Sequence, residues 1–440
     1  MSRVTIVGAG LAGSLLAIYL AKRGIEADVY EARGDMRLEE VAAGRSINLA
    51  LSDRGIAALR EVGMDEYMLA EAVPMYGRMI HSPAGDTKLL PYSGRKGEYI
   101  NSVSRAGLNI ALINEAEKHE GIRFHFNKRC VDADLPSAEV KFESGEALKT
   151  APVIATDGAG SAVRQAMEKQ LLDYEASSIF LDHGYKELHI PPGPSGKHQL
   201  EKNVLHIWPR HQFMMIALPN FDGSFTCTLF LAHTGEISFE QLTDDASVTE
   251  FFKREFADAV PLMPTLVEDF FDNPTGHLGT IKCSPWHVDG KALLLGDAAH
   301  AMVPFYGQGM NCAFEDVRVL ASLIDERGDD WATTFVAFET QRKPNADAIC
   351  DMAEENFYEM RDAVADPVFQ RKRELETKLE QTYPDYFSKY SMVTFREDMP
   401  YSEAKARGNA QDALLMQLCV DAESVEELNL DAVRERVAAL

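Results

Sequence analysis

The N-terminal segment constrains the fold of this chain more than any later stretch. Residues 3–7 (RVTIV) have the uninterrupted apolar pattern of a buried parallel strand, and the glycine-rich run GAGLAG follows directly. A helical pattern then ends at Gly24, a typical helix stop, and residues 27–30 form a second strand pattern. This order predicts a strand, a tight turn, a helix and a parallel strand, which together make a βαβ-type unit.

Three glycines of this run, Gly8, Gly10 and Gly13, fit the G-x-G-x-x-G pattern of dinucleotide-binding proteins. The first glycine permits the turn, the second lets the backbone approach a pyrophosphate, and the third lets the helix pack on the strand. Glu31 follows the second strand and is predicted to accept hydrogen bonds from the ribose of an adenosine. The pattern does not distinguish NAD from FAD, and the alternative is a glycine-rich turn beside a solvated carboxylate.

Alternating patterns later in the chain predict one antiparallel sheet built from two distant segments. They cover residues 75–90 and 203–232, and both segments contain turn residues. Because the nucleotide-binding pattern resumes between and after these segments, the domains are expected to be discontinuous. We expect an FAD-binding domain at 1–74, 95–170 and 285–360, a sheet-rich substrate domain at 75–94 and 171–284, and a C-terminal helical region at 361–440.

Two later motifs favour FAD over NAD. Residues 156–164 (TDGAGSAVR), which include Asp157, resemble the Asp-Gly motif of flavoprotein hydroxylases, and residues 296–300 (GDAAH) resemble their Gly-Asp motif. Asp297 follows a strand and is placed to accept hydrogen bonds from the ribityl hydroxyls. Residues 307–311 open a helix, whose N-terminal amides can stabilise negative charge on a reduced flavin.

Longer stretches resemble the kynurenine 3-monooxygenases, a family within the class A, single-component FAD-dependent aromatic hydroxylases. The matching stretches are 30–33 (YEAR), 44–52 (GRSINLALS), 79–82 (MIHS), 102–105 (SVSR), 296–311 (GDAAHAMVPFYGQGMN), 356–361 (NFYEMR) and 390–395 (YSMVTF). The resemblance implies an α/β fold. Its Rossmann-like FAD-binding domain is interrupted by a substrate domain with a mixed or antiparallel sheet, and a helical region follows.

The resemblance also implies the residues of two sites. The implied FAD contacts are Ala12, Tyr30, Glu31, Arg33, Ala50, Arg105, Cys130, Asp297, Met310 and Asn311. The implied substrate contacts are Arg78, Tyr92, Asn356 and Tyr390, with Phe305 and Tyr306 beside the aromatic ring of the substrate. Tyr306 is a position at which members of the family differ.

Arg78 can also be interpreted from its own surroundings. It lies beside Met79 and Ile80 in an apolar strand pattern, and a guanidinium there needs an anionic partner because an unpaired buried charge is costly. The α-carboxylate of an amino acid would serve, with the hydroxyls of Tyr92 and Tyr390 completing its hydrogen bonds. The alternative is a strand-edge arginine paired with a carboxylate of the protein itself.

The reaction implied by the resemblance is an NADPH- and O2-dependent hydroxylation. FAD would be bound, NADPH would be a transient co-substrate, and a C4a-hydroperoxyflavin would convert L-kynurenine to 3-hydroxykynurenine in tryptophan degradation. The cofactor carries this chemistry, so no catalytic side chain is assigned. Two alternatives remain: a hydroxylase of another aromatic acid or amino acid, and a non-catalytic flavoprotein that serves as a redox interaction module.

The composition limits partners and location. The 69 acidic and 44 basic residues give a net charge of -25, which repels nucleic acid and anionic lipid surfaces. The six cysteines include no C-x-x-C pair, so neither a metal site nor a disulfide framework is predicted. We find no signal-peptide pattern and no apolar stretch of membrane-spanning length. A cytoplasmic enzyme is expected, without the hydrophobic C-terminal anchor that several eukaryotic family members carry.

Two further features receive structural interpretations. His300 is interpreted as a structural histidine, because no acid-base partner is visible near it in the sequence. Ser424 and Glu427 form the pattern of a capping box for a last helix that ends at Leu440. That helix is expected to pack against the protein or to take part in a homodimer.

Overall fold

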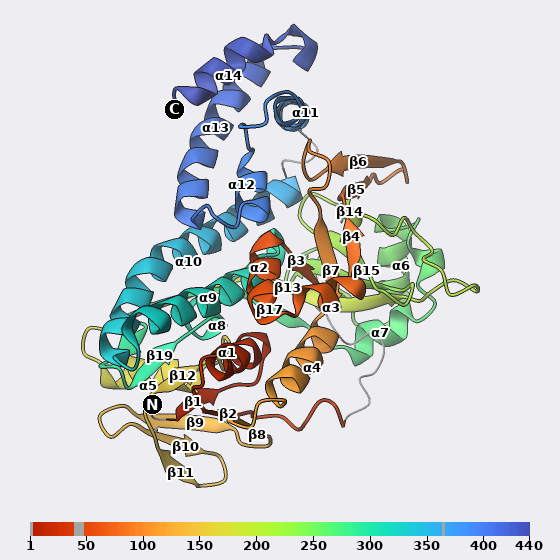
Figure 1. Cartoon of the computed structure of the whole chain (residues 1–440). Coiled ribbons are helices and arrows are strands. Elements are labelled where there is room, and N and C mark those ends of the chain that lie inside the picture. Colours follow the sequence, from red (N-terminus) through yellow and green to blue (C-terminus); the bar gives the residue numbers. More distant parts are fainter. Residues whose placement is uncertain (1–2, 39–47, 363–365) are drawn as a thin grey trace.

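The computed structural model describes residues 3–38, 48–362 and 366–440 (Figure 1). Residues 44–47, which begin one of the family-like stretches, lie outside the described residues, as does the side chain of Arg361. Within the described ranges, no helix is both long and apolar enough to cross a membrane.

The N-terminal strand lies inside a six-stranded sheet with the order β18-β19-β12-β1-β2-β8. All neighbours pair in parallel except β18, which pairs antiparallel with β19. Every residue of β1 is buried, as its uninterrupted apolar sequence predicts. The strands are β1 (Val4–Val7), β2 (Ala27–Tyr30), β8 (Ile122–His125), β12 (Val153–Ala155), β18 (His287–Val288) and β19 (Ala292–Leu294).

Helix α1 (Leu11–Ala21) connects β1 to β2, so the predicted βαβ unit is confirmed. It packs against α4 (Arg105–Ala116) and α9 (Gly309–Arg327). The other helices of this part are α2 (Asp53–Val62), α3 (Asp65–Ala70), α5 (Ala162–Gln170) and α8 (Asp297–His300). Two small antiparallel sheets, β3-β7-β4 and β11-β10-β9, complete it. Their strands are β3 (Asn48–Leu51), β4 (Val73–Met75), β7 (Ile100–Ser104), β9 (Cys130–Asp134), β10 (Glu139–Phe142) and β11 (Ala147–Lys149).

The two distant alternating segments join in one seven-stranded sheet, ordered β17-β13-β16-β15-β14-β5-β6. The sheet is mixed rather than purely antiparallel, because β5 and β14 pair in parallel. More than a hundred residues separate these two strands, so no hairpin turn forces them to run in opposite directions. The strands are β5 (Gly77–His81), β6 (Thr87–Pro91), β13 (Glu175–Ile190), β14 (Leu205–Pro209), β15 (Met214–Pro219), β16 (Phe225–Ala232) and β17 (Gly276–Ser284).

One face of this sheet is covered by helices α6 (Asp245–Glu255) and α7 (Leu266–Asp272). Trp208 and Phe225 of the sheet form a hydrophobic core with Phe252 and Phe270 of these helices. The larger core of the molecule contains Met214 and Phe230 from the same sheet and residues of the six-stranded sheet. The seven-stranded sheet therefore separates two cores.

The C-terminal helices extend from the end of α10 (Trp331–Asp362), and Figure 1 draws them in blue at one end of the molecule. They are α11 (Pro367–Thr382), α12 (Lys389–Phe395), α13 (Tyr401–Asp421) and α14 (Leu430–Ala438). Leu375, Leu379 and Leu415 belong to a hydrophobic cluster between α11 and α13. The helical character predicted for this region is confirmed.

The capping box predicted for the last helix is wrong. Ser424 precedes a single 3-10 turn, Val425–Glu427, and its side chain makes no capping hydrogen bond. Asn429 caps α14 instead, since its Oδ1 accepts a hydrogen bond of 3.1 Å from the amide of Ala432. Asparagine caps helices as well as serine does, and Asn429 is the cap residue that directly precedes α14.

Candidate active site

The three glycines of the first turn have different surroundings. Gly8 has a φ of +103°, and a Cβ there would lie 2.6 Å from the carbonyl oxygen of Thr156. A Cβ on Gly13 would lie only 2.0 Å from the carbonyl oxygen of Gly8. Around Gly10, at the N-terminus of α1, a Cβ would meet no atom within 4 Å. The turn is therefore closely packed on the side of β12 and open above Gly10, where a pyrophosphate could approach the backbone.

Glu31 is fixed at the end of β2 by three hydrogen bonds. Its Oε2 accepts from the amide of Ala9 at 2.8 Å, and its Oε1 accepts from the amide and the Nε of Arg33 at 2.9 and 2.8 Å. Burial opposes ionisation, but these donors hold the pKa of Glu31 below its usual value. The carboxylate is thus ionised and keeps lone pairs for further donors, as contact with a ribose would require.

The neighbouring expected cofactor residues lie around the same turn. Tyr30 stacks on His125 with ring centroids 4.6 Å apart. Ala12 is half-buried in the first turn of α1, and Arg105 is exposed at the start of α4. Cys130 begins β9, and burial raises the pKa of its thiol to about 12, so the thiol is neutral.

Asp157 offers an acceptor that the protein does not use. Its Oδ2 accepts a hydrogen bond of 2.8 Å from the amide of Ala162, whereas its buried Oδ1 has no hydrogen-bond partner among the described residues. Burial raises the pKa of this carboxyl group. A buried oxygen without a partner is costly, so a donor from a bound molecule, such as a flavin nucleotide hydroxyl, fits here.

Asp297 begins α8 with its side chain exposed, next to Gly296 with a φ of +62°. The amide of Gly296 donates to Asp316 Oδ2 at 3.2 Å. Asp297 itself makes no hydrogen bond or ion pair within the described ranges, and it follows strand β19 of the parallel sheet. A free carboxylate beyond the carboxyl end of a parallel strand is a typical ligand-binding position.

Helix α9 begins at Gly309, and the amides of its first turn have no carbonyl of the helix to bond. Met310 and Asn311 occupy this turn. The side chain of Asn311 is fully used by the protein: Oδ1 accepts from Ser52, and Nδ2 donates to Ala50 and Gly307. Its amide group thus joins β3 to α9. A contact of Asn311 with a cofactor would therefore come from its backbone.

A cavity at the junction of β5, α10, α11 and α12 contains four of the six expected substrate residues. Arg78, Tyr306, Asn356 and Tyr390 line it. Tyr92 is buried beside Arg78 and Tyr390, and its ring stacks on that of Tyr390 with a centroid distance of 5.2 Å. The structure thus brings residues from four separate parts of the chain to one place.

The surroundings of Arg78 suit the binding of an anion. Its buried Nε has no hydrogen-bond partner among the described residues. Its guanidinium carbon lies 5.0 Å from the ring centroid of Tyr390 and 5.6 Å from that of Tyr92. Burial raises the pKa of both phenols, so both hydroxyls remain protonated and can donate. Within the described ranges no carboxylate forms an ion pair with Arg78, which argues against the structural alternative.

Phe305 and Tyr306 close the aromatic side of this region. Phe305 lies 4.9 Å from Phe230 and 4.5 Å from Phe357, measured between ring centroids. Asn356 Nδ2 donates to the carbonyl of Phe305 at 2.6 Å, so the side chain of Asn356 fixes the backbone that follows Pro304.

The opposite wall of the cavity is charged, and the sequence did not lead us to it. Lys372 lies 2.5 Å from Asp412 and 3.1 Å from Glu376, measured between the charged atoms. Arg373 pairs with Glu376 at 2.7 Å, and Lys389 pairs with Asp412 at 2.7 Å. The spacing of Lys372 and Glu376 indicates a helix ion pair, but it does not reveal that α11 faces the cavity.

His300 has a partner that the sequence interpretation missed. Its Nε2 lies 2.6 Å from Asp316, which also forms an ion pair of 2.6 Å with Arg342. His300, Cys312 and Asp316 could in principle ligate a metal ion, but the guanidinium of Arg342 already lies among them, 3.4 Å from Cys312 Sγ. Although burial opposes it, the contacts with His300 and Arg342 hold the pKa of Asp316 below its usual value. The cluster is structural.

Known proteins resemble this chain in sequence and in fold. The model of the FAD binding domain family matches residues 1–353. A kynurenine 3-monooxygenase of Myxococcus xanthus (strain DK1622) is 48% identical, covering 99% of this chain and 94% of its own length. One from Legionella pneumophila (strain Corby) is 42% identical, covering 99% and 97%.

Two solved structures share the fold at low sequence identity. The 2-methyl-3-hydroxypyridine-5-carboxylic acid oxygenase has 20% identity and a TM-score of 0.68, covering 90% of this chain and 96% of its own. The p-nitrophenol 4-monooxygenase from Pseudomonas putida DLL-E4 has 17% identity and a TM-score of 0.69, covering 92% and 99%. The predicted aromatic-hydroxylase fold is confirmed.

Proposed function

The chain belongs to the kynurenine 3-monooxygenase family of FAD-dependent monooxygenases, and on that premise we propose that it hydroxylates L-kynurenine to 3-hydroxykynurenine. FAD is the bound cofactor, and NADPH and O2 are the co-substrates. The observation that carries the choice of substrate is Arg78, whose buried Nε lacks a partner in a cavity beside two tyrosines.

The residues present fit FAD. The open space above Gly10 and the N-terminus of α1 would take the pyrophosphate, and Glu31 would take the adenosine ribose. Asp297 and the unpartnered Oδ1 of Asp157 supply acceptors for hydroxyl groups. When bound, the flavin would supply the redox chemistry that activates O2.

The side chains of the cavity would bind and orient the substrate. Arg78 would pair with the α-carboxylate, while Tyr92 and Tyr390 would donate hydrogen bonds to it. With the carboxylate fixed, the aromatic ring of the substrate would extend toward Phe305 and Tyr306. A fixed orientation is the main rate advantage that these side chains can provide.

The same residues would keep water away. Tyr306 and Phe305 are buried, with the ring of Tyr390 stacked on that of Tyr306 and the ring of Phe230 tilted against that of Phe305. Exclusion of water on this aromatic side of the cavity would disfavour the loss of a reactive oxygen species to solvent. The amides at the start of α9 would stabilise negative charge on the bound cofactor. We assign no side chain as nucleophile or general base.

The experiment compares two proteins and two ligands. Arg78→Met keeps much of the side-chain length but removes the charge, which should cost roughly 2 to 5 kcal/mol of L-kynurenine binding. An analogue in which hydrogen replaces the carboxylate should lose much less from the same substitution. Substrate-stimulated NADPH oxidation and binding titrations report both quantities.

Arg60→Met is a matched control, because Arg60 is an exposed arginine of α2 whose side chain is 59% accessible. This variant should bind both ligands as the parent does. If Arg78→Met weakens the binding of both ligands equally, Arg78 is structural, and the assignment retreats to an aromatic hydroxylase of unknown substrate.

A further inference from the structure

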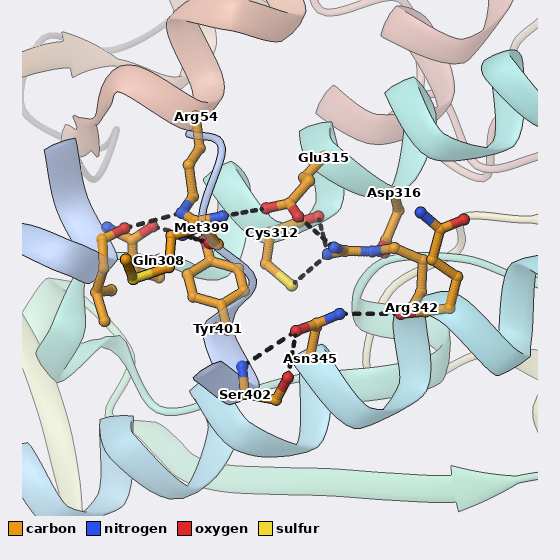
Figure 2. Close-up of polar contacts among 12 residues, drawn as sticks. Arg54, Gln308, Cys312, Glu315, Asp316, Arg342, Asn345, Met399, Tyr401 and Ser402 are labelled. Carbon is orange, nitrogen blue, oxygen red and sulfur yellow. Dashed lines mark hydrogen bonds and ion pairs between the residues drawn. The ribbon is translucent and has the colours of Figure 1, made fainter. Parts of the chain in front are cut away.

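A buried polar chain joins the C-terminal helices to the helix that begins at the expected flavin site (Figure 2). Its centre is Arg54 of α2, which is 1% exposed. Arg54 Nε donates to the carbonyl of Val393 at 2.8 Å, and its Nη2 donates to the carbonyl of Met399. Its Nη1 lies 2.9 Å from Glu315 of α9. One guanidinium thus holds both the end of α12 and the start of the turn into α13.

Tyr401 extends this connection to the first turn of α9. Its ring centroid lies 3.9 Å from the guanidinium carbon of Arg54, and its hydroxyl donates to Gln308 Oε1 at 2.9 Å. Tyr401 is fully buried and Gln308 is 3% exposed. Gln308 is the residue before α9, and its carbonyl accepts the first hydrogen bond of that helix, from Cys312. The position of Tyr401 therefore bears directly on the start of α9.

The two ends of the chain belong to two different sites. At one end, α12 carries Tyr390, whose ring faces Arg78 in the substrate cavity. At the other end, the first turn of α9 carries Met310 and Asn311, which are expected beside the flavin. Only a few contacts, all buried, separate the ends.

These contacts cannot be loosened one at a time without cost. A buried guanidinium that loses a partner leaves a charge without compensation, which is strongly unfavourable. Glu315 also pairs with Arg342, and Arg342 pairs with Asp316, so Arg54 is fixed from the side of α9 and α10 as well. A shift of α12 would therefore be transmitted through Arg54 and Tyr401 rather than absorbed locally.

We propose that Arg54 and Tyr401 are positioning residues that couple the substrate cavity to the flavin site through Gln308. A ligand held by Tyr390 fixes α12, and the chain Arg54–Tyr401–Gln308 then fixes the first turn of α9. Binding of the substrate and binding of FAD consequently strengthen each other. This inference rests on the proposed function, because it takes L-kynurenine as the ligand at Tyr390.

Tyr401→Phe tests the proposal, since it removes only the hydroxyl and leaves a ring over Arg54. The apoprotein is titrated with FAD, with and without saturating L-kynurenine and without NADPH, so that no turnover occurs. In the parent protein, L-kynurenine should lower the Kd for FAD by about fivefold or more. In Tyr401→Phe, the ratio of the Kd for FAD without L-kynurenine to the Kd with L-kynurenine should fall to about one. The affinity for L-kynurenine in the presence of saturating FAD should fall by at most the value of this ratio in the parent.

Ser402→Ala is the matched control. Ser402 follows Tyr401, and its hydroxyl donates to Asn345 Oδ1 at 3.0 Å, a bond that leads to α10 and not to the start of α9. The variant loses one hydrogen bond of similar length and should keep the coupling ratio of the parent. A purely structural role of Tyr401 would weaken FAD binding equally with and without the ligand.

Gln308→Met approaches the same bond from its other end, so a folding defect in one variant does not end the test. Each single variant and the double variant should give the same ratio of Kd values for FAD, because all three lack the same hydrogen bond between Tyr401 and Gln308. If Tyr401→Phe or Gln308→Met keeps the parent's ratio of Kd values for FAD without and with L-kynurenine, the proposal is overturned. The proposal is also overturned if this ratio is about one in the parent, although the parent binds and hydroxylates L-kynurenine. Failure of the parent to bind L-kynurenine overturns the proposed function as well.

Discussion

Single residues in the first turn have separable physical roles. Gly13 is required by packing, because any Cβ there would overlap the carbonyl of Gly8. Gly10 has a φ of -72°, which every residue can adopt, and free space around it. A glycine with neither conformational nor packing need is best explained by a ligand that approaches its backbone closely.

Gly10→Ala and Gly13→Ala should therefore fail in different ways. Gly10→Ala should fold with the stability of the parent apoprotein but bind FAD much more weakly, because its methyl group enters the space of the pyrophosphate. Gly13→Ala should lose stability itself, because α1 can no longer pack on β1. Urea unfolding of the apoproteins and FAD titration separate the two effects. FAD binding by Gly10→Ala as tight as by the parent would contradict this assignment of the turn.

At the scale of secondary-structure elements, two histidines form a hydrogen bond between β5 and β14, the strands that connect the two distant segments of the seven-stranded sheet. His206 of β14 lies between the carbonyl of Glu201, at 2.8 Å from Nε2, and His81 of β5, at 2.9 Å from Nδ1. His81 also contacts Asp258, which follows α6. Because a carbonyl only accepts hydrogen bonds, Nε2 of His206 carries the proton and Nδ1 accepts from His81.

This pairing predicts a pH dependence of stability. Burial lowers the pKa of His206 from 6.5 to about 4. Between these values the unfolded chain binds a proton that the folded chain excludes, so stability is lost as the pH falls through this window, by up to about 3 kcal/mol. His206→Gln cannot titrate. The free energy of unfolding in urea should be lower for His206→Gln than for the parent. This difference should be largest at neutral pH and shrink toward about pH 4. A deficit that stays constant would show that His206 does not titrate as expected.

The elements differ in how far the sequence could predict them. The βαβ unit, the Gly-Asp motif and the helix after it are local patterns, and the sequence predicts them directly. The parallel pairing of β5 with β14 and the bond from Tyr401 to Gln308 join residues far apart in the chain. No periodicity encodes such contacts, because they depend on how distant segments meet. The helix cap at Asn429 shows the remaining local ambiguity between two candidate cap residues.

In the whole molecule, the expected substrate cavity lies where three layers meet. The seven-stranded sheet contributes Arg78, α10 contributes Asn356, and the C-terminal helices contribute Tyr390 and the charged wall of α11. Most of the expected FAD contacts lie beyond the carboxyl ends of strands β1, β2 and β19 of the six-stranded sheet and at the start of α9. No single layer contains all the expected contacts of a site, so we expect the C-terminal helices to take part in substrate binding.

We propose that this assembly transfers one oxygen atom from O2 to L-kynurenine. The most direct measurement is the mass of the product formed by the FAD-loaded protein from L-kynurenine, NADPH and isotopically heavy O2. We expect a product heavier than L-kynurenine by one heavy oxygen atom, with the hydroxyl group ortho to the ring amine. NADPH oxidation that leaves L-kynurenine unchanged, or a product without the heavy isotope, would contradict the claim.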